Sequence, residues 1–280
     1  MTVFHTPMVT LSDGNLIPQI GLGVLRIDDE GVTPVVESAL KAGYRHIDGA
    51  AGYNNEAGVG RALKNAGFTQ GENRKNLWVT TKLRDSEQGY DSARKAFDRQ
   101  LDLLQLDYVD MYMLHWPTPF DWRSGETWKA FDEFRAEGRV RSLGVCNFLP
   151  EHLERLHEET GEYPAVNQIE CHPLWNRKPL IAFCRSHGIA VQAYAPLARG
   201  LYLNREIMQQ LAEKYVRTEA QIGLRYLVQQ GISVIPKSTQ PDHIFANADV
   251  FDFELSEADM ALIDTMDEQL RSASIPDDLL

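Results

Sequence analysis

Four side chains that can carry charge or exchange protons each accompany a short apolar stretch in the first half of the sequence. Asp48 ends YRHID, Tyr53 follows in the same segment, Lys82 lies near the end of WVTTKL, and His115 directly follows MYML. An unpaired polar side chain that is buried at such a position costs roughly 2–7 kcal/mol. We therefore expect the four side chains to share one polar site.

The types of these residues predict proton transfer through a phenol. A free tyrosine has a pKa of about 10, and a nearby ammonium such as that of Lys82 would lower the pKa of Tyr53 because it favours the phenolate. Asp48 would keep Lys82 charged and oriented. His115 would orient a carbonyl oxygen or share in the proton relay.

Each residue taken alone has a simpler interpretation. A pair such as Asp48 and Lys82 is often only a structural ion pair, and a histidine before Trp-Pro is often a hydrogen-bonded core residue. A tyrosine in a loop carries little information. The conjunction of all four near the ends of neighbouring strands favours one shared site over four independent accidents.

The elements that must position these residues alternate between strand and helix. Apolar residues repeat with helical spacing between the strand candidates, for example at Phe97, Leu101 and Leu104, and such a stripe covers one face of a helix. Short apolar runs bounded by turn residues predict strands. The predicted strands are Ile20–Val24, His46–Asp48, Leu77–Thr81, Val109–Leu114, Ser142–Cys146, Ala165–Ile169, Ala190–Tyr194 and Ser233–Ile235.

Eight strands that alternate with helices predict an α/β fold with a parallel sheet. An open nucleotide-binding sheet should carry GxGxxG after its first strand, but Gly21 and Gly23 are followed by VLRIDDEGV, without the third glycine. We therefore predict a single (β/α)8 TIM barrel over residues 1–280, with the two glycines packed tightly at its floor. The sequence SDGN at 12–15, between two apolar runs, predicts an N-terminal β-hairpin.

Composition limits the classes of partner. The chain has 280 residues, of which 43% are hydrophobic, and a net charge of −12. A duplex-binding protein usually has a basic surface, so no nucleic-acid partner is expected. The three cysteines form no CxxC pair, which favours a reducing compartment. Neither a signal peptide nor a membrane span is recognisable, so we expect a cytoplasmic protein without a membrane partner.

A barrel carries its active site on the loops at the carboxyl ends of its strands. Asp48, Lys82 and His115 lie at the ends of the second, third and fourth predicted strands, and Tyr53 lies just beyond the second. Neighbouring strands would bring all four residues to one patch of the rim.

The sequence resembles the aldo-keto reductases over nearly its whole length, and is most similar to the bacterial branch that includes 2,5-diketo-gluconate reductases. Seven motifs of that family occur in the expected order. They are IDGAAGYNNE (47–56), TTKL (80–83), LHWP (114–117), GVCNF (144–148), NQIECHP (167–173), YAPL (194–197) and IPKS (235–238).

The resemblance implies an NADPH-dependent oxidoreductase that reduces aldehydes or ketones to alcohols. Hydride would pass from the nicotinamide to the carbonyl carbon, and Tyr53 would protonate the oxygen, with Lys82 and Asp48 lowering its pKa and His115 orienting the substrate. The small-molecule carbonyl substrates that it suggests include keto acids, diketones and keto-sugars such as 2,5-diketo-gluconate. Members of the family are often monomers.

The resemblance also implies a set of binding residues. Asn147 and Gln168 would hold the nicotinamide carboxamide, and Tyr194 would stack on the ring. The substrate pocket would include Leu25, Arg84, Trp116 and Trp122. The full set of implied cofactor contacts is Val24, Cys146, Asn147, Gln168, Tyr194, Leu197, Arg199, Lys237, Ser238, Thr239, His243 and Asn247.

Several positions depart from the family pattern. Cys146 replaces a serine, so it is either a weaker donor to the carboxamide or a small buried filler. His243 and Ala246 replace an arginine and a glutamate near the 2′-phosphate, while Lys237 and Ser238 remain. We therefore expect NADPH use with weakened selectivity and some activity with NADH.

Two arginines have open interpretations. Arg199 would contact the cofactor pyrophosphate or lie in a solvated loop. Arg84 would favour anionic or polar substrates, or its side chain would extend to solvent.

Two other functions compete with the reductase. One is a non-catalytic, cofactor-binding regulatory protein of the same fold, against which the intact tetrad argues. The other is a metal-dependent hydrolase using His115 and His172, but these residues lack metal-ligand spacing with other His or Asp residues, so no metal is expected.

Overall fold

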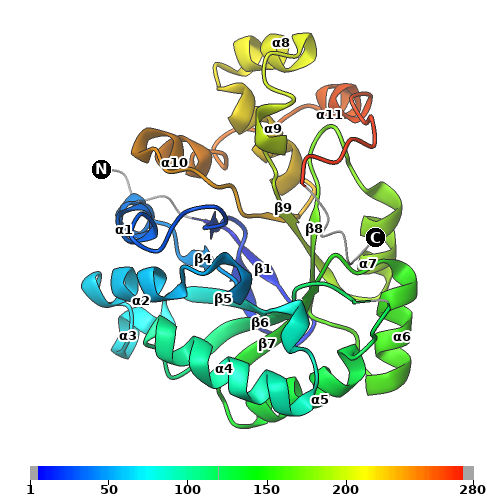
Figure 1. Ribbon diagram of the computed structural model, residues 1–280. Coiled ribbons are helices and arrows are strands. Elements are labelled where there is room, and N and C mark those ends of the chain that lie inside the picture. The colour runs from blue at the N-terminus through cyan, green and yellow to red at the C-terminus, as the bar shows by residue number, and fades with distance from the viewer. Residues whose placement is uncertain (1–5, 119, 274–280) are drawn as a thin grey trace.

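The computed structural model describes residues 6–118 and 120–273. Its centre is an eight-stranded parallel sheet in which the strands neighbour one another in chain order. Figure 1 shows the helices arranged around these strands. The strands are β3 (Leu22–Gly23), β4 (His46–Asp48), β5 (Trp78–Leu83), β6 (Val109–Leu114), β7 (Val140–Cys146), β8 (Val166–Glu170), β9 (Ala190–Tyr194) and β10 (Ser233–Val234).

The sheet closes on itself between its first and last strands. Ile20 forms a parallel bridge with Val234. The amide of Gly21 donates to the Val234 carbonyl at 2.9 Å, and the amide of Gly23 donates to the Pro236 carbonyl at 3.1 Å. This closure confirms the predicted (β/α)8 barrel, and the eight predicted strand positions hold to within a few residues at each end.

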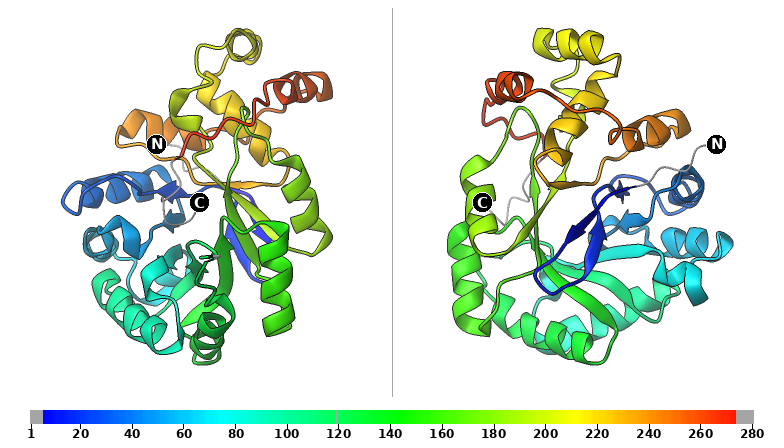
Figure 2. Two further views of the ribbon diagram at one scale, coloured as in Figure 1. Left: turned by 45° about the vertical axis from the view of Figure 1, so that its right-hand side comes forward. Right: turned by 180° about the vertical axis from the view of Figure 1, so that it is seen from behind.

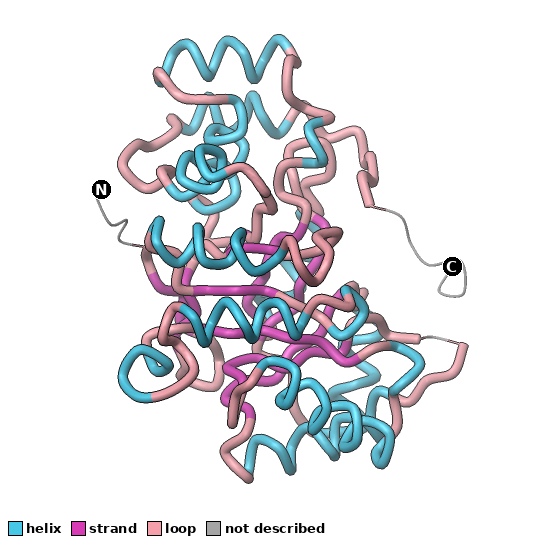
Figure 3. Tube along the Cα trace, turned by 60° about the vertical axis from the view of Figure 1, so that its left-hand side comes forward, coloured by secondary structure: helices cyan, strands magenta, loops and turns pink. Residues whose placement is uncertain are grey.

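Helices cover the outside of the barrel and join successive strands (Figure 3). The predicted stripe of Phe97, Leu101 and Leu104 is buried in α4. At the end of α1, Gly43 adopts a φ of 106°, the left-handed conformation that glycine takes readily. The helices are α1 (Val32–Ala42), α2 (Glu56–Asn65), α3 (Gly71–Lys75), α4 (Tyr90–Leu104), α5 (Ser124–Ala136), α6 (Pro150–Thr160), α7 (Lys178–Ser186), α8 (Glu206–Tyr215), α9 (Glu219–Val228), α10 (Pro241–Ala248) and α11 (Glu257–Asp264).

The N-terminal hairpin covers one end of the barrel. It consists of β1 (Met8–Thr10) and β2 (Leu16–Pro18), which pair antiparallel as the SDGN turn predicts. Leu11 and Ile17 are buried in one cluster with interior residues such as Trp78 and Met111. Figure 2 shows the hairpin across the barrel in the view from behind. The hairpin therefore closes the floor, and the opposite rim is left for the site.

The two glycines before and in β3 have different surroundings. A Cβ atom on Gly21 would lie 2.6 Å from Nδ1 of His46, so tight packing excludes a side chain there. Gly23 lies instead at the rim, where it lines the cavity described below. The predicted floor packing therefore applies to Gly21 and is wrong for Gly23.

Two further features concern the cysteines and the helices. Cys146, Cys171 and Cys184 are free and buried. No helix within residues 6–118 and 120–273 is both long enough and apolar enough to cross a membrane.

Candidate active site

The structure brings the four predicted chemical side chains together at the carboxyl ends of β4, β5 and β6. Asp48 ends β4, Tyr53 ends the short helix η1 (Ala51–Tyr53), Lys82 lies in β5, and His115 follows β6. The Lys82 ammonium donates to Oδ1 of Asp48 at 2.6 Å and lies 3.5 Å from the Tyr53 hydroxyl. The rings of Tyr53 and His115 meet edge to face, with centroids 5.8 Å apart.

Lys82 carries a buried charge that its surroundings stabilise. Its side chain is 0% exposed, and that of Asp48 is 1% exposed. Burial opposes the charge of the ammonium, but Asp48 and Tyr53 nevertheless raise the pKa of Lys82 above its ordinary value. A third donor bond, to the Gly49 carbonyl at 2.9 Å, fixes the ammonium in place. Lys82 therefore stays a cation at any physiological pH.

The phenol of Tyr53 keeps its proton more firmly than the sequence suggests. Burial raises the pKa of Tyr53 to about 12, although Lys82 pulls the pKa down. Asp48 also raises this pKa rather than lowering it, since its negative charge disfavours a phenolate. The prediction of a lowered pKa is wrong, because it counted the ammonium and omitted burial.

His115 is neutral at ordinary pH. Burial lowers the pKa of His115 to about 3, and the positive charges of Lys82 and Arg84 act in the same direction. A neutral imidazole carries one N–H and can donate a hydrogen bond to a carbonyl oxygen. A neutral imidazole does not supply a proton as an imidazolium would, so of the two predicted roles its lowered pKa favours orientation of a substrate.

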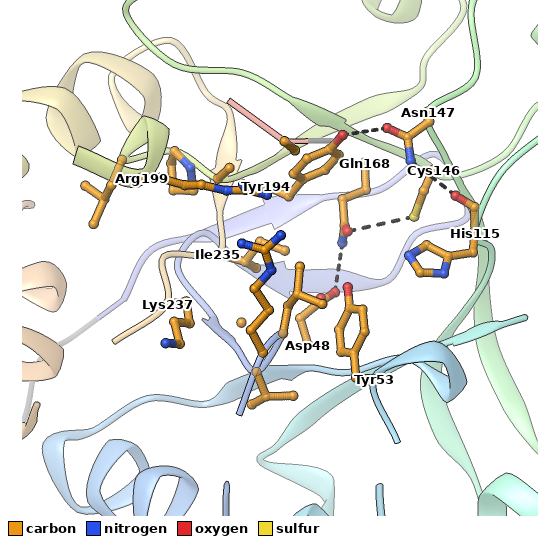
Figure 4. Close-up of a pocket in the computed structure, with 18 of the residues that line it drawn as sticks. Asp48, Tyr53, His115, Cys146, Asn147, Gln168, Tyr194, Arg199, Ile235 and Lys237 are labelled. Atoms are coloured by element: carbon orange, nitrogen blue, oxygen red, sulfur yellow. Dashed lines mark hydrogen bonds between the residues drawn. The ribbon is translucent and has the colours of Figure 1, made fainter. Parts of the chain in front are cut away.

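Amide side chains hold the neighbouring groups in place (Figure 4). The Tyr194 hydroxyl donates to Oδ1 of Asn147 at 2.8 Å, and Nδ2 of Asn147 donates to the His115 carbonyl at 3.2 Å. Asn147 adopts a φ of 63°, a left-handed conformation that asparagine tolerates better than most residues. On the far side of Asp48, Nε2 of Gln168 donates to Oδ2 of the carboxylate at 2.8 Å.

A cavity of about 550 Å³ opens beside these groups. Most of the predicted site residues line it, whereas Lys82 is not in the lining but bonds to Asp48, which is. The predicted residues in the lining are Val24, Leu25, Asp48, Tyr53, His115, Trp116, Cys146, Asn147, Gln168, Tyr194, Leu197, Arg199 and Lys237.

The lining includes residues that the sequence did not single out. Arg26 directly follows Val24 and Leu25 at the end of the first barrel strand, so the rim rule itself could have found it. Ile235 also faces the cavity, as the predicted end of the last strand. Ala273 lines the cavity from the C-terminal segment, and no signal in the sequence points to it.

Ala273 reaches the cavity because buried Glu170 anchors the segment that carries it. Oε1 of Glu170 accepts hydrogen bonds from the Ser272 amide and hydroxyl, both at 2.6 Å, and from the Ala273 amide at 3.0 Å. His172 contacts the same oxygen at 3.1 Å. These bonds lower the pKa of Glu170 although burial alone would raise it.

Two predicted substrate-pocket residues lie outside the cavity lining. The Arg84 guanidinium donates to the Ala51 carbonyl at 2.9 Å and to Oδ1 of Asn54 at 2.8 Å. Trp122 donates its indole N–H to Glu159 at 2.8 Å. Each side chain bonds to neighbouring groups, and neither belongs to the lining of the cavity beside Tyr53.

Four predicted cofactor residues also lie outside the lining, in and before α10. Ser238 accepts the Gln240 amide at 3.1 Å, Thr239 and His243 are exposed, and Asn247 is buried. Cys146 does line the cavity, but its thiol also contacts Sδ of Met113 at 3.6 Å and Oε1 of Gln168 at 3.8 Å. Burial raises the pKa of this thiol, so it stays protonated.

The cavity has a positive side. Arg26, Arg199 and Lys237 line it and are exposed. Within the described residues, none of the three takes part in an ion pair. Arg199 adopts a φ of 51°, in a loop where Ala195 and Ala198 are also left-handed. A bound molecule with several negative charges could therefore pair with cations that no carboxylate of the described residues neutralises.

The part of the chain that the structure describes contains no group of three His, Cys, Asp or Glu side chains able to hold a metal ion. His172, which the hydrolase hypothesis would use, contacts Glu170 and is 0% exposed.

Comparison with known proteins identifies the family. The model of the Aldo/keto reductase family matches residues 19–268. The chain belongs to the aldo/keto reductase family. It is therefore an oxidoreductase in a family that acts on small carbonyl compounds, and the resemblance stated from its motifs is confirmed.

Individual relatives are similar over nearly their whole length. An aldo-keto reductase of Mycolicibacterium smegmatis is 46% identical, covering 97% of each chain. The methylglyoxal reductase DkgA of Escherichia coli is 43% identical, covering 96% of this chain and 97% of the relative.

Solved structures of the family share the fold. An aldo/keto reductase from Brucella melitensis superposes with a TM-score of 0.90 at 46% identity, covering 94% of this chain and all of its own. A Bombyx mori aldo-keto reductase in complex with NADP superposes with a TM-score of 0.89 at 36% identity, covering 96% of this chain and 95% of its own.

Proposed function

We propose that this aldo/keto reductase reduces aldehydes or ketones to alcohols with NADPH, with Tyr53 as the proton donor. One observation carries the proposal. The Tyr53 hydroxyl lies 3.5 Å from the Lys82 ammonium, which is itself held by Asp48 at 2.6 Å. A protonated phenol beside a fixed buried cation can lose its proton to a strong base and remain stabilised as phenolate.

The donor set of the cavity fits a dinucleotide phosphate. Amide groups of Asn147 and Gln168 suit a carboxamide, and the ring of Tyr194 offers a flat face for stacking. The unpaired cations Arg199 and Lys237 suit phosphate groups, as does Arg26. The Bombyx mori relative in complex with NADP supports this choice of cofactor. When bound, the nicotinamide would supply the hydride that reduces the carbonyl carbon.

The side chains of this enzyme then complete the reduction. Neutral His115 donates a hydrogen bond to the carbonyl oxygen and orients it toward Tyr53. As the carbon is reduced, the oxygen gains the basicity of an alkoxide, and Tyr53 transfers its phenolic proton to it. Lys82 stabilises the phenolate that remains, and solvent later returns a proton to that phenolate. The pKa of about 12 keeps Tyr53 protonated until the alkoxide forms.

We infer a cofactor preference for NADPH that is weaker than a charged fork would give. His243 and Ala246 stand where relatives carry an arginine and a glutamate, and Lys237 with Ser238 remains for the 2′-phosphate. A ratio of kcat/KM for NADPH over NADH above roughly a thousand, about 4 kcal/mol, would contradict this inference.

We infer small dicarbonyl compounds as the preferred substrates, with keto acids, other diketones and keto-sugars such as 2,5-diketo-gluconate as further candidates. Leu25 and Trp116 give the cavity apolar walls, and Arg84, which bonds to the Ala51 carbonyl, is not among the residues that line it. The similarity to a methylglyoxal reductase supports this class. Comparing a keto acid with a neutral dicarbonyl, in the wild type and in Arg84→Ala, tests it. Loss of keto-acid activity alone in the variant would contradict the inference.

The decisive experiment measures NADPH oxidation with a panel of aldehydes, diketones, keto acids and keto-sugars, in the wild type and in Tyr53→Phe. We expect turnover in the wild type, and loss of turnover in the variant by a factor of about a hundred or more, with cofactor binding retained. Normal NADPH binding without turnover of any carbonyl would instead support a non-catalytic regulatory protein of the same fold.

We further infer that residues 1–280 act as one domain, as a monomer in the cytoplasm that does not bind nucleic acid. The span of the family match, residues 19–268, supports a single domain, and the net charge of −12 disfavours nucleic acid. Light scattering coupled to gel filtration tests the monomer, and a mass of twice 31.7 kDa would refute it.

A further inference from the structure

A layer of polar side chains crosses the barrel interior beside Asp48. Gln168 of β8 pairs in register with Gln192 of β9, and Gln192 pairs with Ser233 of β10. The three side chains therefore lie at one level of the barrel. Each is at most 3% exposed, so their polar atoms must find partners inside the protein.

The layer forms a continuous row of hydrogen bonds. Nε2 of Gln168 donates to Oδ2 of Asp48 at 2.8 Å and to Oε1 of Gln192 at 2.6 Å. Nε2 of Gln192 donates to the Ser233 hydroxyl at 3.2 Å, and that hydroxyl donates to the Pro18 carbonyl at 3.3 Å. The row thus runs from the proposed catalytic carboxylate to the hairpin that closes the barrel floor.

The Asp48 end of the row is enough to fix the direction of the bonds made by Gln168, and the Pro18 end agrees with it. The Asp48 carboxylate, paired with Lys82, can only accept hydrogen bonds, and so can the Pro18 carbonyl. The atom of Gln168 that faces Asp48 must therefore be its NH2 group. Its second hydrogen needs an acceptor, which is the Gln192 oxygen. A reversed Gln168 would oppose oxygen to oxygen at both contacts.

This direction leaves one atom of Gln168 for a ligand. Both amide hydrogens of Gln168 are used inside the barrel, and within residues 6–118 and 120–273 its Oε1 accepts a hydrogen bond only from the Cys146 thiol, at 3.8 Å. Gln168 also lines the cavity. Its free contribution to a bound nicotinamide is therefore an acceptor, which suits the NH2 of the carboxamide.

We propose that Gln192 is a positioning residue for the cofactor, because it takes the second hydrogen of Gln168 and so holds the Gln168 oxygen as the acceptor for the carboxamide NH2. This proposal rests on one part of the proposed function, namely that Gln168 contacts the carboxamide of the cofactor. Gln192 is not among the residues that line the cavity. It acts only through Gln168.

The test uses Gln192→Met, which keeps the length of the side chain and removes its acceptor. The readout is the Kd of NADP⁺ and of its 3-acetylpyridine analogue, whose acetyl group lacks the carboxamide NH2. Both are titrated by quenching of tryptophan fluorescence, since Trp116 lines the cavity. Ser233→Ala is the matched control, because it removes the next bond of the row and leaves the Gln192 oxygen facing Gln168. Thermal unfolding of each variant checks that it is folded.

We expect Gln192→Met to raise the Kd of NADP⁺ about three- to tenfold, the effect of losing one neutral hydrogen bond. The Kd of the analogue should change by less than about twofold, as should both values in Ser233→Ala. A purely structural role for Gln192 would weaken both ligands equally, and that result would overturn the proposal. An unchanged Kd for both ligands would also overturn it.

Gln168→Met separates this proposal from the proposed function. If Gln168→Met weakens NADP⁺ more than the analogue but Gln192→Met does not, the carboxamide contact stands and the role of Gln192 is refuted. If Gln168→Met fails to discriminate between the two ligands, the carboxamide contact itself is wrong and the role of Gln192 falls with it.

Discussion

Two buried ion pairs, one at the rim of the barrel and one nearer its floor, are alike in distance and unlike in what surrounds them. Lys82 donates to Asp48 at 2.6 Å, and Arg74 of α3 donates to Asp110 of β6 at 2.7 Å. All four side chains are at most 3% exposed. Burial and distance alone therefore do not distinguish a catalytic pair from a structural one.

The floor pair is held by several neighbouring chain segments, and among the described residues only Nε of Arg74 has no hydrogen-bond partner in this pair. Asp110 also accepts from the Val79 amide at 2.9 Å and from Arg141 at 3.0 Å. The Arg74 guanidinium donates to the Leu77 carbonyl at 2.7 Å as well as to Asp110. Arg74 and Asp110 spend most of their bonding capacity on neighbouring chain segments, which is what a structural pair does.

The rim pair is open at one contact. Lys82 makes two short bonds, to Asp48 and Gly49, and one long contact of 3.5 Å to the Tyr53 hydroxyl, at the limit of a hydrogen bond. A negative phenolate oxygen would accept a stronger, charge-assisted hydrogen bond from this ammonium. The proposed catalytic pair therefore differs from the structural pair in its long contact to a third group, the Tyr53 hydroxyl.

The largest predicted effect is the loss of kcat in Lys82→Met, a substitution in the rim pair. Without the ammonium nothing stabilises the Tyr53 phenolate, so kcat should fall by about 10²–10⁴. Steady-state NADPH oxidation with a small dicarbonyl measures it, and the cofactor Kd, measured by fluorescence, checks that the cavity is intact. A loss in kcat below tenfold would refute the role given to Lys82.

The same substitution in the floor pair, Arg74→Met, should act on stability instead. It leaves Asp110 without its most buried cation, and removing one partner of such a pair costs about 3–5 kcal/mol. Urea denaturation measures the loss in unfolding free energy. At a temperature where the variant is folded, kcat should stay within about twofold of the wild type. A fall in kcat like that of Lys82→Met would erase the distinction between the pairs.

Two histidines extend the comparison to pH. Burial lowers the pKa of His115, at the rim, and of His46, in the interior, to about 3 each. The ordinary pKa of histidine is about 6.5. Between pH 6.5 and pH 3 the unfolded chain therefore binds protons at these two side chains and the folded chain does not. The part of the unfolding free energy that depends on these neutral histidines is therefore fully present above pH 6.5. It is lost as the pH falls toward 3, by about 1.4 kcal/mol per pH unit for each histidine.

His46→Gln measures one of these contributions. Its unfolding free energy is followed by urea denaturation between pH 7 and pH 4. With falling pH it should decrease less steeply than that of the wild type, by about 1.4 kcal/mol per pH unit, the contribution of one histidine. Over the same range kcat of the wild type should show no inflection from His115. An inflection near pH 6.5 that disappears in His115→Gln would contradict the neutral imidazole.

The smallest effect concerns the exposed cations. Arg199→Ala should raise the Kd of NADPH about two- to tenfold, because it removes an unpaired charge from the cavity, and the effect should shrink in high salt. Arg141→Ala is the control, since Arg141 is an exposed cation already paired with Asp110. An unchanged Kd of NADPH in Arg199→Ala would refute the proposed contact between Arg199 and a phosphate group.

The barrel and the tetrad could be predicted because they depend on local patterns. Apolar stretches set the strands, and the rim rule then placed Asp48, Tyr53, Lys82 and His115 together without knowledge of distances. The direction of the Tyr53 pKa could not be predicted in this way. It depends on how deeply the phenol is buried, and burial is a property of the whole fold.

Long-range contacts explain the other differences. Arg84 directly follows β5 at the rim, where pocket residues are expected, but its guanidinium bonds to the Ala51 carbonyl and Asn54. Ala273 enters the cavity because Glu170, over a hundred positions earlier, holds the segment beside it. Residue type predicts neither the bonds of Arg84 nor the position of Ala273. Each depends on which residues the fold brings close to it.

The closure of the barrel sets an order for assembly of the enzyme. Ile20 bridges Val234, 214 positions later, and the cavity lining runs from Gly23 to Ala273. Contacts between such distant positions slow folding. A chain growing from its N-terminus would therefore have to wait for nearly its last strand before Gly23 and Ile235 could meet. We expect the nascent chain to acquire cofactor affinity in a single late step, and not gradually as its strands emerge.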